Sequence, residues 1–299
     1  MILIFGGGGQ LGRELARAAA NDGLGFVSLA HGDCDIADEK AVDDALDDHQ
    51  PQLVINAAAY TKVDEAENSV AAARRGNETG PDVVARNCAA KQVPLIHIST
   101  DYVFDGEKKG PYSELDPIAP ISVYGNTKAA GEAAVRRALE HHVIVRTAWV
   151  YSEFGNNFLK TILRLAQERE ELRIVADQHG CPTSARDLAN ALLAISPRLI
   201  KGDNVWGTYH FAGLGVTTWF AFAQRIVAMQ EPFTGKRPKL CPIATSEYPT
   251  LAKRPRNSAF DCKHFISTFG FSPRHWTDEA DAVVRALANS VTSKDSSIA

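Results

Sequence analysis

The sequence predicts a doubly wound α/β fold, in which helices cover both faces of a parallel sheet. Short runs of aliphatic and β-branched residues alternate with helical stretches through the first half of the chain. Continuous apolar strands separated by helices are typical of parallel sheets that are buried on both faces. The strand candidates are MILIF (1–5), GFVSLA (25–30), QLVINAA (52–58), VPLIHIS (93–99) and HVIVRTA (142–148).

The composition excludes several classes of protein. With 299 residues, 45% of them hydrophobic, the chain is long enough for a large core and two lobes. The net charge of −4 and the lack of a long basic run argue against nucleic acid or an anionic membrane as a partner. The first residues, MILIFGGGGQ, lack the features of a signal peptide. Five scattered cysteines without a Cys-x-x-Cys pair predict reduced thiols in a cytoplasmic protein, and no metal site.

A glycine-rich loop directly follows the first predicted strand. In FGGGGQLGREL, Gly6, Gly9 and Gly12 recur at every third residue before a predicted helix. Glycines permit a tight turn and the close approach of a pyrophosphate to the backbone, and the helix N-terminus supplies free N–H groups. This position between strand and helix predicts a dinucleotide-binding domain of the Rossmann type.

The second predicted strand lacks the acidic residue that usually binds the adenosine ribose. It ends in SLAHG, with Ala30 and His31 where Asp or Glu is expected. A carboxylate there would repel a 2′-phosphate, so we expect the chain to use NADPH at least as well as NADH. Asp35 and Ile36 follow shortly and are placed to flank the adenine, although Asp35 is equally suited to be only a helix N-cap.

A hydroxyl, a phenol and an ammonium form the predicted catalytic set. Thr100 ends the fourth predicted strand, and Tyr124 and Lys128 share one face of the alanine-rich helix that follows. Behind a glycine-rich dinucleotide loop, this set resembles that of the short-chain dehydrogenase/reductases, which implies carbonyl reduction. That reaction needs a hydride from a nicotinamide and a proton for the developing alkoxide. A free phenol, with a pKa of about 10, is a poor acid at neutral pH, and a nearby positive charge lowers that pKa. We therefore predict Tyr124 as proton donor, Lys128 as its tuner and a ligand of the ribose, and Thr100 as the anchor of the substrate oxygen.

The strand–helix pattern loosens after Trp149, which predicts a smaller α/β lobe. In open α/β sheets ligands bind beyond the carboxyl ends of the strands, so a lobe there closes a cleft. Residues 1–149 and about 184–205 are expected to form the dinucleotide-binding domain, and about 150–183 and 206–299 the substrate lobe. Helices are expected near 157–170, 184–196 and 217–230, and strands at LRIVAD and GTYHFAG.

The combination of glycine loop, hydroxyl and Tyr-x-x-x-Lys resembles the short-chain dehydrogenase/reductases. Over nearly its whole length the sequence resembles one family among them, the dTDP-4-dehydrorhamnose reductases. The resemblance implies NAD(P)H-dependent reduction of the C4 keto group of dTDP-4-dehydro-6-deoxy-L-mannose to dTDP-L-rhamnose, the last step of dTDP-rhamnose synthesis. It is carried by FGGGGQLGREL, VINAAAYTKVDEAE, HISTDYVFDG, VYGNTKAAGE, VRTAWVYSEFGNNF, DQHGCPT and RPRNSAFD.

The resemblance also implies binding residues. Those implied at the cofactor are Gly9, Gln10, Leu11, Asp35, Ile36, Ala59, Tyr60 and Thr61, together with Tyr124 and Lys128. Those implied at the dTDP-4-keto-6-deoxyhexose are Thr100, Asp101, Tyr102 and Trp149, with Asn157 and Arg254 as extensions. Trp149 is suited to pack against a sugar face and Arg254 to bind a diphosphate. The alternatives are an ordinary core tryptophan and an exposed charge run.

Two other functions stay open at this point. One is a reductase, dehydratase or epimerase of another nucleotide sugar, although the Thr-Asp-Glu triplet of the dehydratases is Thr100-Asp101-Tyr102 here. The other is a non-catalytic regulatory subunit that keeps the dinucleotide fold, against which the complete Thr, Tyr and Lys set argues. Some relatives form a magnesium-bridged dimer built from glutamates. Only Glu14 matches such a residue, so no metal site is predicted, and a homodimer without one stays open.

Overall fold

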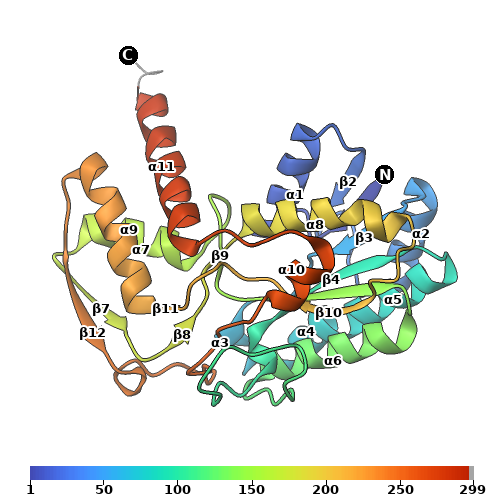
Figure 1. Ribbon diagram of the computed structural model, residues 1–299, viewed down its shortest axis with the longest axis horizontal. Helices are drawn as coiled ribbons and strands as arrows, with labels where there is room; N and C mark the ends of the chain where they lie inside the picture. The colour runs from blue at the N-terminus through green and yellow to red at the C-terminus, as the bar shows by residue number, and fades with distance from the viewer. Residues whose placement is uncertain (296–299) are drawn as a thin grey trace.

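A six-stranded parallel sheet forms the centre of the first lobe in the computed structural model, which describes residues 1–295 and their side chains as far as residue 289 (Figure 1). The strand order is β10-β5-β4-β3-β1-β2, and every neighbouring pair is parallel. We expected five of these strands in the first half of the chain, and all five are present. The six are β1 (Ile2–Phe5), β2 (Phe26–Leu29), β3 (Leu53–Asn56), β4 (Leu95–Thr100), β5 (His142–Thr147) and β10 (Gly207–His210).

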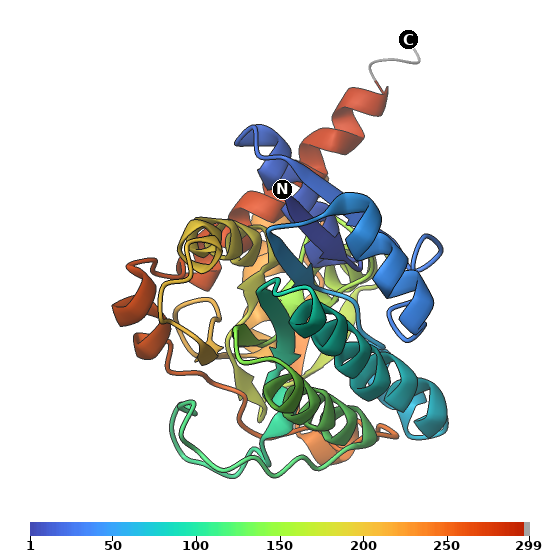
Figure 2. The same ribbon diagram turned by 90° about the vertical axis from the view of Figure 1, so that its right-hand side faces the viewer.

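Helices cover both faces of this sheet, which confirms the predicted doubly wound fold (Figure 2). Side chains alternate along β1, so Ile2 and Ile4 belong to one core and Leu3 and Phe5 to the other. The first core is closed by α1 (Gln10–Asn21) and α8 (Ala185–Ile200). The second is closed by α2 (Glu39–His49), α5 (Gly80–Ala90) and α6 (Val123–Ala138).

A second, smaller lobe lies on the left in Figure 1 and has an apolar core of its own. Three helices, α7 (Phe158–Glu168), α9 (Trp219–Thr234) and α11 (Trp276–Asp295), pack around the parallel pair of β7 (Glu171–Val175) and β12 (Lys239–Ile243). The helices expected near 157–170, 184–196 and 217–230 are present as α7, α8 and α9. Short elements complete the chain: α3 (Val63–Ala66), α4 (Val70–Arg74), a π-helical turn (Arg75–Thr79), 3₁₀ turns (Asp101–Val103, Thr245–Glu247), β6 (Val150–Tyr151), β8 (His179–Gly180), β9 (Thr183–Ser184), β11 (Thr217–Thr218) and α10 (Lys263–Phe269).

The expected lobe boundary at residue 206 is wrong for one segment. β10 was assigned to the substrate lobe, but it pairs in parallel with β5, with Tyr209 opposite Val145. The chain therefore returns to the main sheet for a strand as well as for α8. The sequence pattern did not indicate this, because strand pairing depends on a partner far away in the chain. The rest of the proposed division into two lobes stays a prediction.

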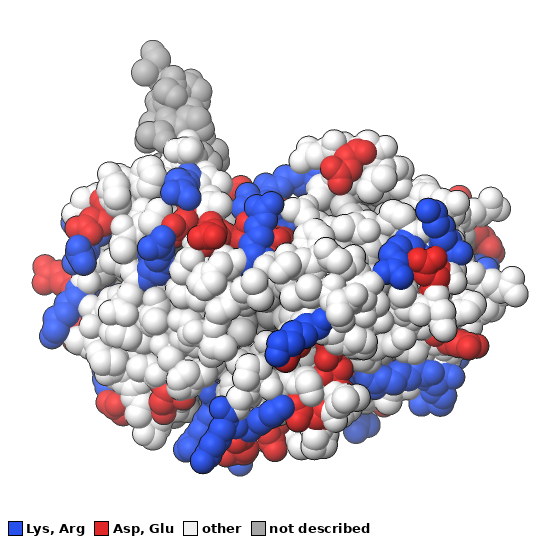
Figure 3. Space-filling view, in the orientation of Figure 1, with Lys and Arg blue, Asp and Glu red and all other residues white. Residues whose placement is uncertain are grey.

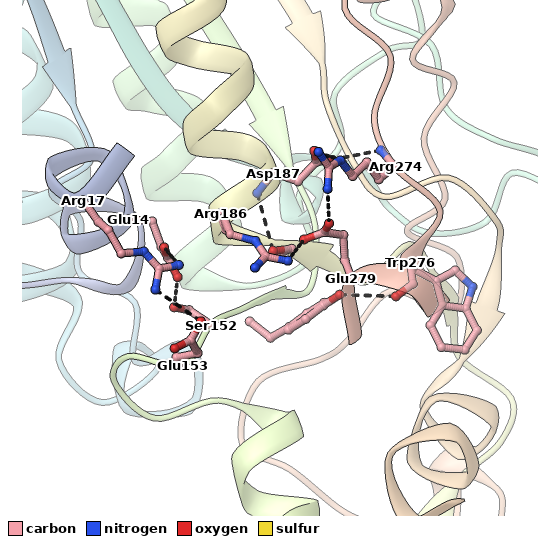
Figure 4. A network of polar contacts seen from close by, with 11 residues as sticks. Glu14, Arg17, Ser152, Glu153, Arg186, Asp187, Arg274, Trp276 and Glu279 are labelled. Carbon is pink, nitrogen blue, oxygen red and sulfur yellow. Dashed lines mark hydrogen bonds and ion pairs between the residues drawn. The ribbon is translucent and has the colours of Figure 1, made fainter. Parts of the chain in front are cut away.

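Two neighbouring groups of polar contacts lie between these elements, one joining α1 to the segment after β6 and the other joining α8 to α11 (Figure 4). Glu14 on α1 is buried, accepts a hydrogen bond from the Ser152 hydroxyl (2.7 Å) and pairs with Arg17 (2.5 Å). Burial raises the pKa of this carboxyl, although Ser152 and Arg17 lower it. In the second group, Glu279 pairs with Arg186 of α8 (2.9 Å) and with Arg274 (3.2 Å). The first group fastens α1, which follows the glycine loop, to the second lobe.

Charges of both signs are interspersed over the face shown in Figure 3. Many of the exposed charges form local pairs, such as Lys40–Asp44 and Arg164–Glu168 one helical turn apart. Among the residues that the structure describes, no helix has the length and apolar character needed to cross a bilayer.

One glycine allows α6 to cross the π-helical turn at close range. A Cβ on Gly131 would lie 2.0 Å from the carbonyl oxygen of Asn77. The side chain of Asn77 in turn binds the backbone N–H (2.8 Å) and C=O (3.1 Å) of Tyr60, and its amide donates to the hydroxyl of Thr127 on α6 (3.2 Å). This crossing therefore holds the segment after β3 in place.

We expect Gly131→Ala to lower the free energy of unfolding by about 1–3 kcal/mol or more, because backbone must move to admit the methyl group. The matched control is Gly25→Ala, where an added Cβ meets nothing within 4 Å. Urea denaturation of both variants measures the difference. Equal free energies of unfolding for the two variants would show that α6 and the π-helical turn can move apart without a loss of stability.

Candidate active site

The glycine loop joins β1 to α1 in the arrangement that a pyrophosphate requires. Gly6 has a φ of +85°, and a Cβ there would lie 2.5 Å from the amide nitrogen of Ala58. A Cβ on Gly12 would lie 2.3 Å from the carbonyl oxygen of Gly6. Gly9 is the N-cap of α1, which has neither a side-chain cap nor an acidic residue in its first turn. The first N–H groups of α1 and the positive end of its helix dipole therefore have no side-chain cap and are suited to an anion.

The other residues expected at the cofactor lie beyond the carboxyl ends of the neighbouring strands β2 and β3. Ala59, Tyr60 and Thr61 follow β3, and Gln10 and Leu11 begin α1 beside them. Asp35 follows β2, and its carboxylate accepts from Arg75 (2.8 Å) and from the Ala37 amide (3.0 Å).

The alternative of Asp35 as a helix cap is wrong, because Asp38 caps α2 by accepting from the Ala41 amide (3.1 Å). Ile36 is buried, and its side chain lies directly against the α-carbon side of Gly80, where an added Cβ would come within 2.5 Å. The carboxylate of Asp35 is therefore paired with Arg75, and the neighbouring Ile36 anchors this segment by packing against Gly80.

Thr100, Tyr124 and Lys128 meet at the carboxyl end of β4. Ser122 caps α6 by accepting from the Gly125 amide (3.1 Å), which starts the helix so that Tyr124 and Lys128 face the sheet. The three side chains are buried, with exposed fractions of 6% for Thr100, 9% for Tyr124 and 2% for Lys128. The Lys128 ammonium donates to the carbonyl of Ile98 (2.7 Å). The structure therefore brings together the predicted catalytic set.

The acid–base properties of this set differ in one respect from our expectation. Burial raises the pKa of the Tyr124 phenol to about 12, although a hydrogen bond with Thr100 lowers it. We expected Lys128 to lower this pKa below that of free phenol, and the net direction is the opposite because burial is the largest influence. Burial also lowers the pKa of Lys128 to about 8, against a raising influence from Glu132. At neutral pH the site thus holds a protonated phenol beside a charged ammonium.

Asp101 and Tyr102 extend the site on the side of β4. The Thr100 hydroxyl donates to the buried carboxylate of Asp101 (2.9 Å). Burial raises the pKa of that carboxyl to about 6, while hydrogen bonds from Ser258 and Thr100 lower it. The Tyr102 ring meets the Tyr124 ring edge to face, with centroids 5.4 Å apart. Both residues therefore lie in contact with the catalytic set, and the contact with the sugar nucleotide that the resemblance implied for them stays a prediction.

Trp149 lies in a stack and is not an ordinary core tryptophan. It is partly exposed, and its φ of +49° is uncommon for a residue with a side chain. Its ring stacks on that of Trp219 at 3.5 Å with an interplanar angle of 7°, and the Trp219 indole N–H donates to Gln178 (3.2 Å). Trp219 was not expected from the sequence, because no spacing connects the start of α9 with the exit of β5.

Arg254 is held in place by an ion pair with the segment that follows β3. Its guanidinium binds the carboxylate of Asp64 in α3 (2.7 Å), which also accepts from the Ala252 amide (3.1 Å). The Nη1 atom of Arg254 is buried and has no hydrogen-bond partner among the described residues. The alternative of an exposed charge run is therefore wrong. Asp64, inside VINAAAYTKVDEAE, was not recognised from the sequence as its partner.

Asn157 is occupied by local contacts at the glycine loop. Its side-chain oxygen caps α7 by accepting from the Lys160 amide (3.0 Å), and its amide donates to Gln10 (2.9 Å) and to the carbonyl of Ser152 (2.8 Å). Asn157 thus connects the first residue of α1 with the second lobe. A contact between Asn157 and the sugar nucleotide stays a prediction.

Known proteins resemble this chain along nearly its whole length. The family model described as the RmlD substrate binding domain matches residues 1–289. A curated dTDP-4-dehydrorhamnose reductase from Sinorhizobium fredii is 40% identical over 288 residues, which cover 96% of this chain and 97% of the relative. The crystal structure of a dTDP-4-dehydrorhamnose reductase from Clostridium acetobutylicum has a TM-score of 0.89 and 37% identity, and covers 96% of this chain and 99% of that one. One from Bacillus anthracis, in complex with NADP, has a TM-score of 0.86 and 34% identity, and covers 94% and 97%.

The buried Asp101 carboxylate makes a testable contribution to stability. Because the folded-state pKa of about 6 lies above the usual 3.8 of an aspartate side chain, folding favours the protonated form. Stability from this group is present at low pH and is lost as the pH rises through about 6. We expect Asp101→Asn, which is neutral at any pH, to raise the free energy of unfolding at pH 8 by about 1–3 kcal/mol and to change it little near pH 4. Urea denaturation at both pH values measures this, and a less stable variant at pH 8 would contradict it.

Proposed function

The chain belongs to the family of the RmlD substrate binding domain, and we propose that it reduces the C4 keto group of dTDP-4-dehydro-6-deoxy-L-mannose with NAD(P)H to give dTDP-L-rhamnose. The reaction is the last step of dTDP-rhamnose synthesis. One observation carries the proposal: Thr100, Tyr124 and Lys128 are buried together at the edge of the sheet where the glycine loop leads into the uncapped N-terminus of α1. The identity to curated reductases of this substrate, along almost the full chain, supports the choice of sugar nucleotide.

The glycine loop and its neighbours fit a nicotinamide dinucleotide. The tight turn, in which Gly6 and Gly12 pack directly against backbone, leaves the uncapped N-terminus of α1 suited to the pyrophosphate. Lys128 is placed to hold the nicotinamide ribose, and the segment from Ala59 to Thr61 to line the same site. When bound, the cofactor supplies the hydride.

Cofactor choice follows from the residues after β2. Ala30 and His31 stand where a carboxylate would repel a 2′-phosphate, and the exposed Arg75 lies on Asp35. NADPH is therefore used at least as well as NADH, in agreement with the NADP bound to the Bacillus anthracis relative.

Tyr124 donates the proton that the developing alkoxide requires. Its phenol is protonated at neutral pH because burial raises its pKa to about 12. The Lys128 ammonium stabilises the phenolate that remains after the transfer, and its charge is retained below a pKa of about 8. Thr100 bonds to the phenol and lies where the substrate oxygen arrives, so it aligns donor and acceptor.

The sugar nucleotide is held from the second lobe. The free Nη1 of Arg254 supplies a charge-assisted donor to the diphosphate, and Asp64 holds the guanidinium in place from the first lobe. Trp149, backed by Trp219, and Tyr102 bound the hexose.

Two alternatives are less well supported by the site. A dehydratase would use an acid where Tyr102 stands, and a regulatory subunit would not need the complete catalytic set. The five cysteines, all free, suit the reducing cytoplasm in which we place this reaction. A homodimer stays a prediction.

We expect Tyr124→Phe to keep NADPH affinity and lose about 10²–10⁴-fold in turnover, because only the proton donor is removed. Oxidation of NADPH with the dTDP-4-keto sugar, followed at 340 nm, measures the turnover. The matched control is Tyr209→Phe, which removes the hydroxyl of another buried tyrosine, bound to the carbonyl of Val205 in the first lobe. A Tyr124→Phe variant within threefold of the parent would exclude Tyr124 as the donor.

Arg254→Ala is expected to raise KM for the sugar nucleotide by roughly ten- to a hundredfold, since a charge-assisted contact contributes about 1.5–3 kcal/mol. Its kcat should fall less, because the diphosphate is bound similarly in the ground and transition states. Lys253→Ala removes the neighbouring exposed charge and serves as the control. If Arg254→Ala instead weakens NADPH binding, the residue belongs to the cofactor site.

A further inference from the structure

A buried carboxylate lies behind the catalytic set and is saturated with donors. Glu132 on α6 has no exposed surface. Its Oε1 accepts from the Ser99 hydroxyl (2.5 Å) and from Nε of Arg146 (2.8 Å). Its Oε2 accepts from Nη2 of Arg146 (2.7 Å) and from Arg136 (2.8 Å). Two cations and a hydroxyl thus fix one carboxylate.

This cluster touches every element that carries the catalytic set. Glu132 lies one helical turn after Lys128, on the same face of α6. Ser99 directly precedes Thr100 on β4, and Arg146 is opposite Ser99 in the register of β4 with β5. Moving Glu132 would therefore affect both the ammonium and the hydroxyl of the site.

Stability alone is a weak reason for such a cluster. Removing a carboxylate and a guanidinium from water costs several kcal/mol per ion, and apolar residues of similar volume often serve a core as well. Lys128, however, is buried as well, and burial disfavours its charge. Glu132 is the group whose negative charge opposes this effect.

Other ionisable groups around Lys128 do not take over this role. On β4, His97 is neutral because burial lowers its pKa well below the usual value. Asp101, in the 3₁₀ turn after β4, is ionised above its pKa of about 6, but the carboxylate whose charge raises the pKa of Lys128 is that of Glu132. On α6, Tyr124 is a neutral phenol, and Arg136 carries a positive charge. On β5, His142 also has a lowered pKa, and Arg146 is a cation bound to Glu132.

We propose that Glu132 is a positioning residue for the reduction, which keeps the buried Lys128 charged and, through Ser99, holds the end of β4 that presents Thr100. The proposal rests on the function proposed above. The catalytic set cannot keep its charge and alignment without a carboxylate at this place. Glu132 itself touches neither the substrate nor the cofactor.

The first test is the pH dependence of Glu132→Gln. A lysine is charged below its pKa, so turnover and NADPH affinity should fall in the parent as the pH rises through about 8. We call this fall at high pH the alkaline limb of the pH profile. An opposite charge nearby shifts a pKa by about 1–3 units, so in the variant the midpoint of the alkaline limb should move to a pH at least one unit lower. At pH 8 this corresponds to a loss of about tenfold relative to pH 6.

A matched control separates this effect from damage to a buried ion pair. Glu279 is also a buried glutamate held by two arginines, Arg186 and Arg274, but it belongs to the group of contacts between α8 and α11 (Figure 4). Glu279→Gln should therefore lower stability without moving the alkaline limb. If both variants move it equally, the proposal is overturned.

A second variant removes the problem that Glu132→Gln leaves Arg146 buried without its partner. Glu132→Gln/Arg146→Met replaces both charges, which is often tolerated in a core, and should still show the shifted limb. Glu132→Asp keeps the charge and should recover at least half of the shift. Ser99→Ala should lower kcat severalfold with an unchanged limb, because it loosens only the end of β4. A double variant with the parent's pH profile would overturn the proposal.

NADPH binding, followed by its fluorescence, gives a readout that does not require turnover. If the alkaline limb of NADPH binding moves in Glu132→Gln, the role of Glu132 is supported whether or not the protein reduces a dTDP-4-keto sugar. A failure to reduce that sugar would refute only the proposed function. An unshifted limb for both binding and turnover in Glu132→Gln refutes the role of Glu132 alone. The two proposals can thus fail separately.

Discussion

The parallel register of the main sheet is the constraint on which the rest of the structure depends. Parallel strands bring all their carboxyl ends to one edge, and here that edge receives the glycine loop after β1, the segment from Ala59 to Thr61 after β3, Thr100 at the end of β4 and Trp149 after β5. Residues distant in the chain thereby become neighbours at this edge. The register also sets the buried layer behind the site, because it places Arg146 beside Ser99.

The site is assembled at a cost in stability that the surrounding packing must offset. The Asp101 carboxyl and the Lys128 ammonium are both buried in forms that burial disfavours, and Trp149 keeps a backbone conformation that is uncommon outside glycine. In each case a neighbour reduces the cost. Thr100 donates a hydrogen bond to Asp101, the negative charge of Glu132 offsets the lowering of the Lys128 pKa by burial, and the ring of Trp219 stacks on that of Trp149. Function and strain therefore occur in the same place.

The two lobes are joined by polar contacts at both ends of the site. On the cofactor side, Gln10 and Glu14 of α1 bind Asn157 and Ser152. On the far side, Asp64 of α3 binds Arg254. Since polar contacts between lobes are more easily exchanged than an apolar core, both joints are compatible with small adjustments when ligands bind. Glu14, which in the sequence matches a metal-bridging glutamate of some relatives, forms an ion pair with Arg17.

The sequence by itself determined the five first strands, the glycine loop and the Thr, Tyr and Lys set, because hydrophobic period and turn chemistry are local and spacing on a helix is fixed by geometry. Tertiary structure decided the rest. β10 belongs to the main sheet because it pairs with β5, which lies far away in the chain. Arg254 likewise forms an ion pair with Asp64, which is distant in the sequence. The rise in the Tyr124 pKa, where we expected a fall, follows from burial, which no spacing reveals. The sequence shows Glu132 four residues after Lys128, but it does not show the contacts with Ser99 and Arg146 on which the proposed role of Glu132 depends. Those contacts form only in the folded sheet.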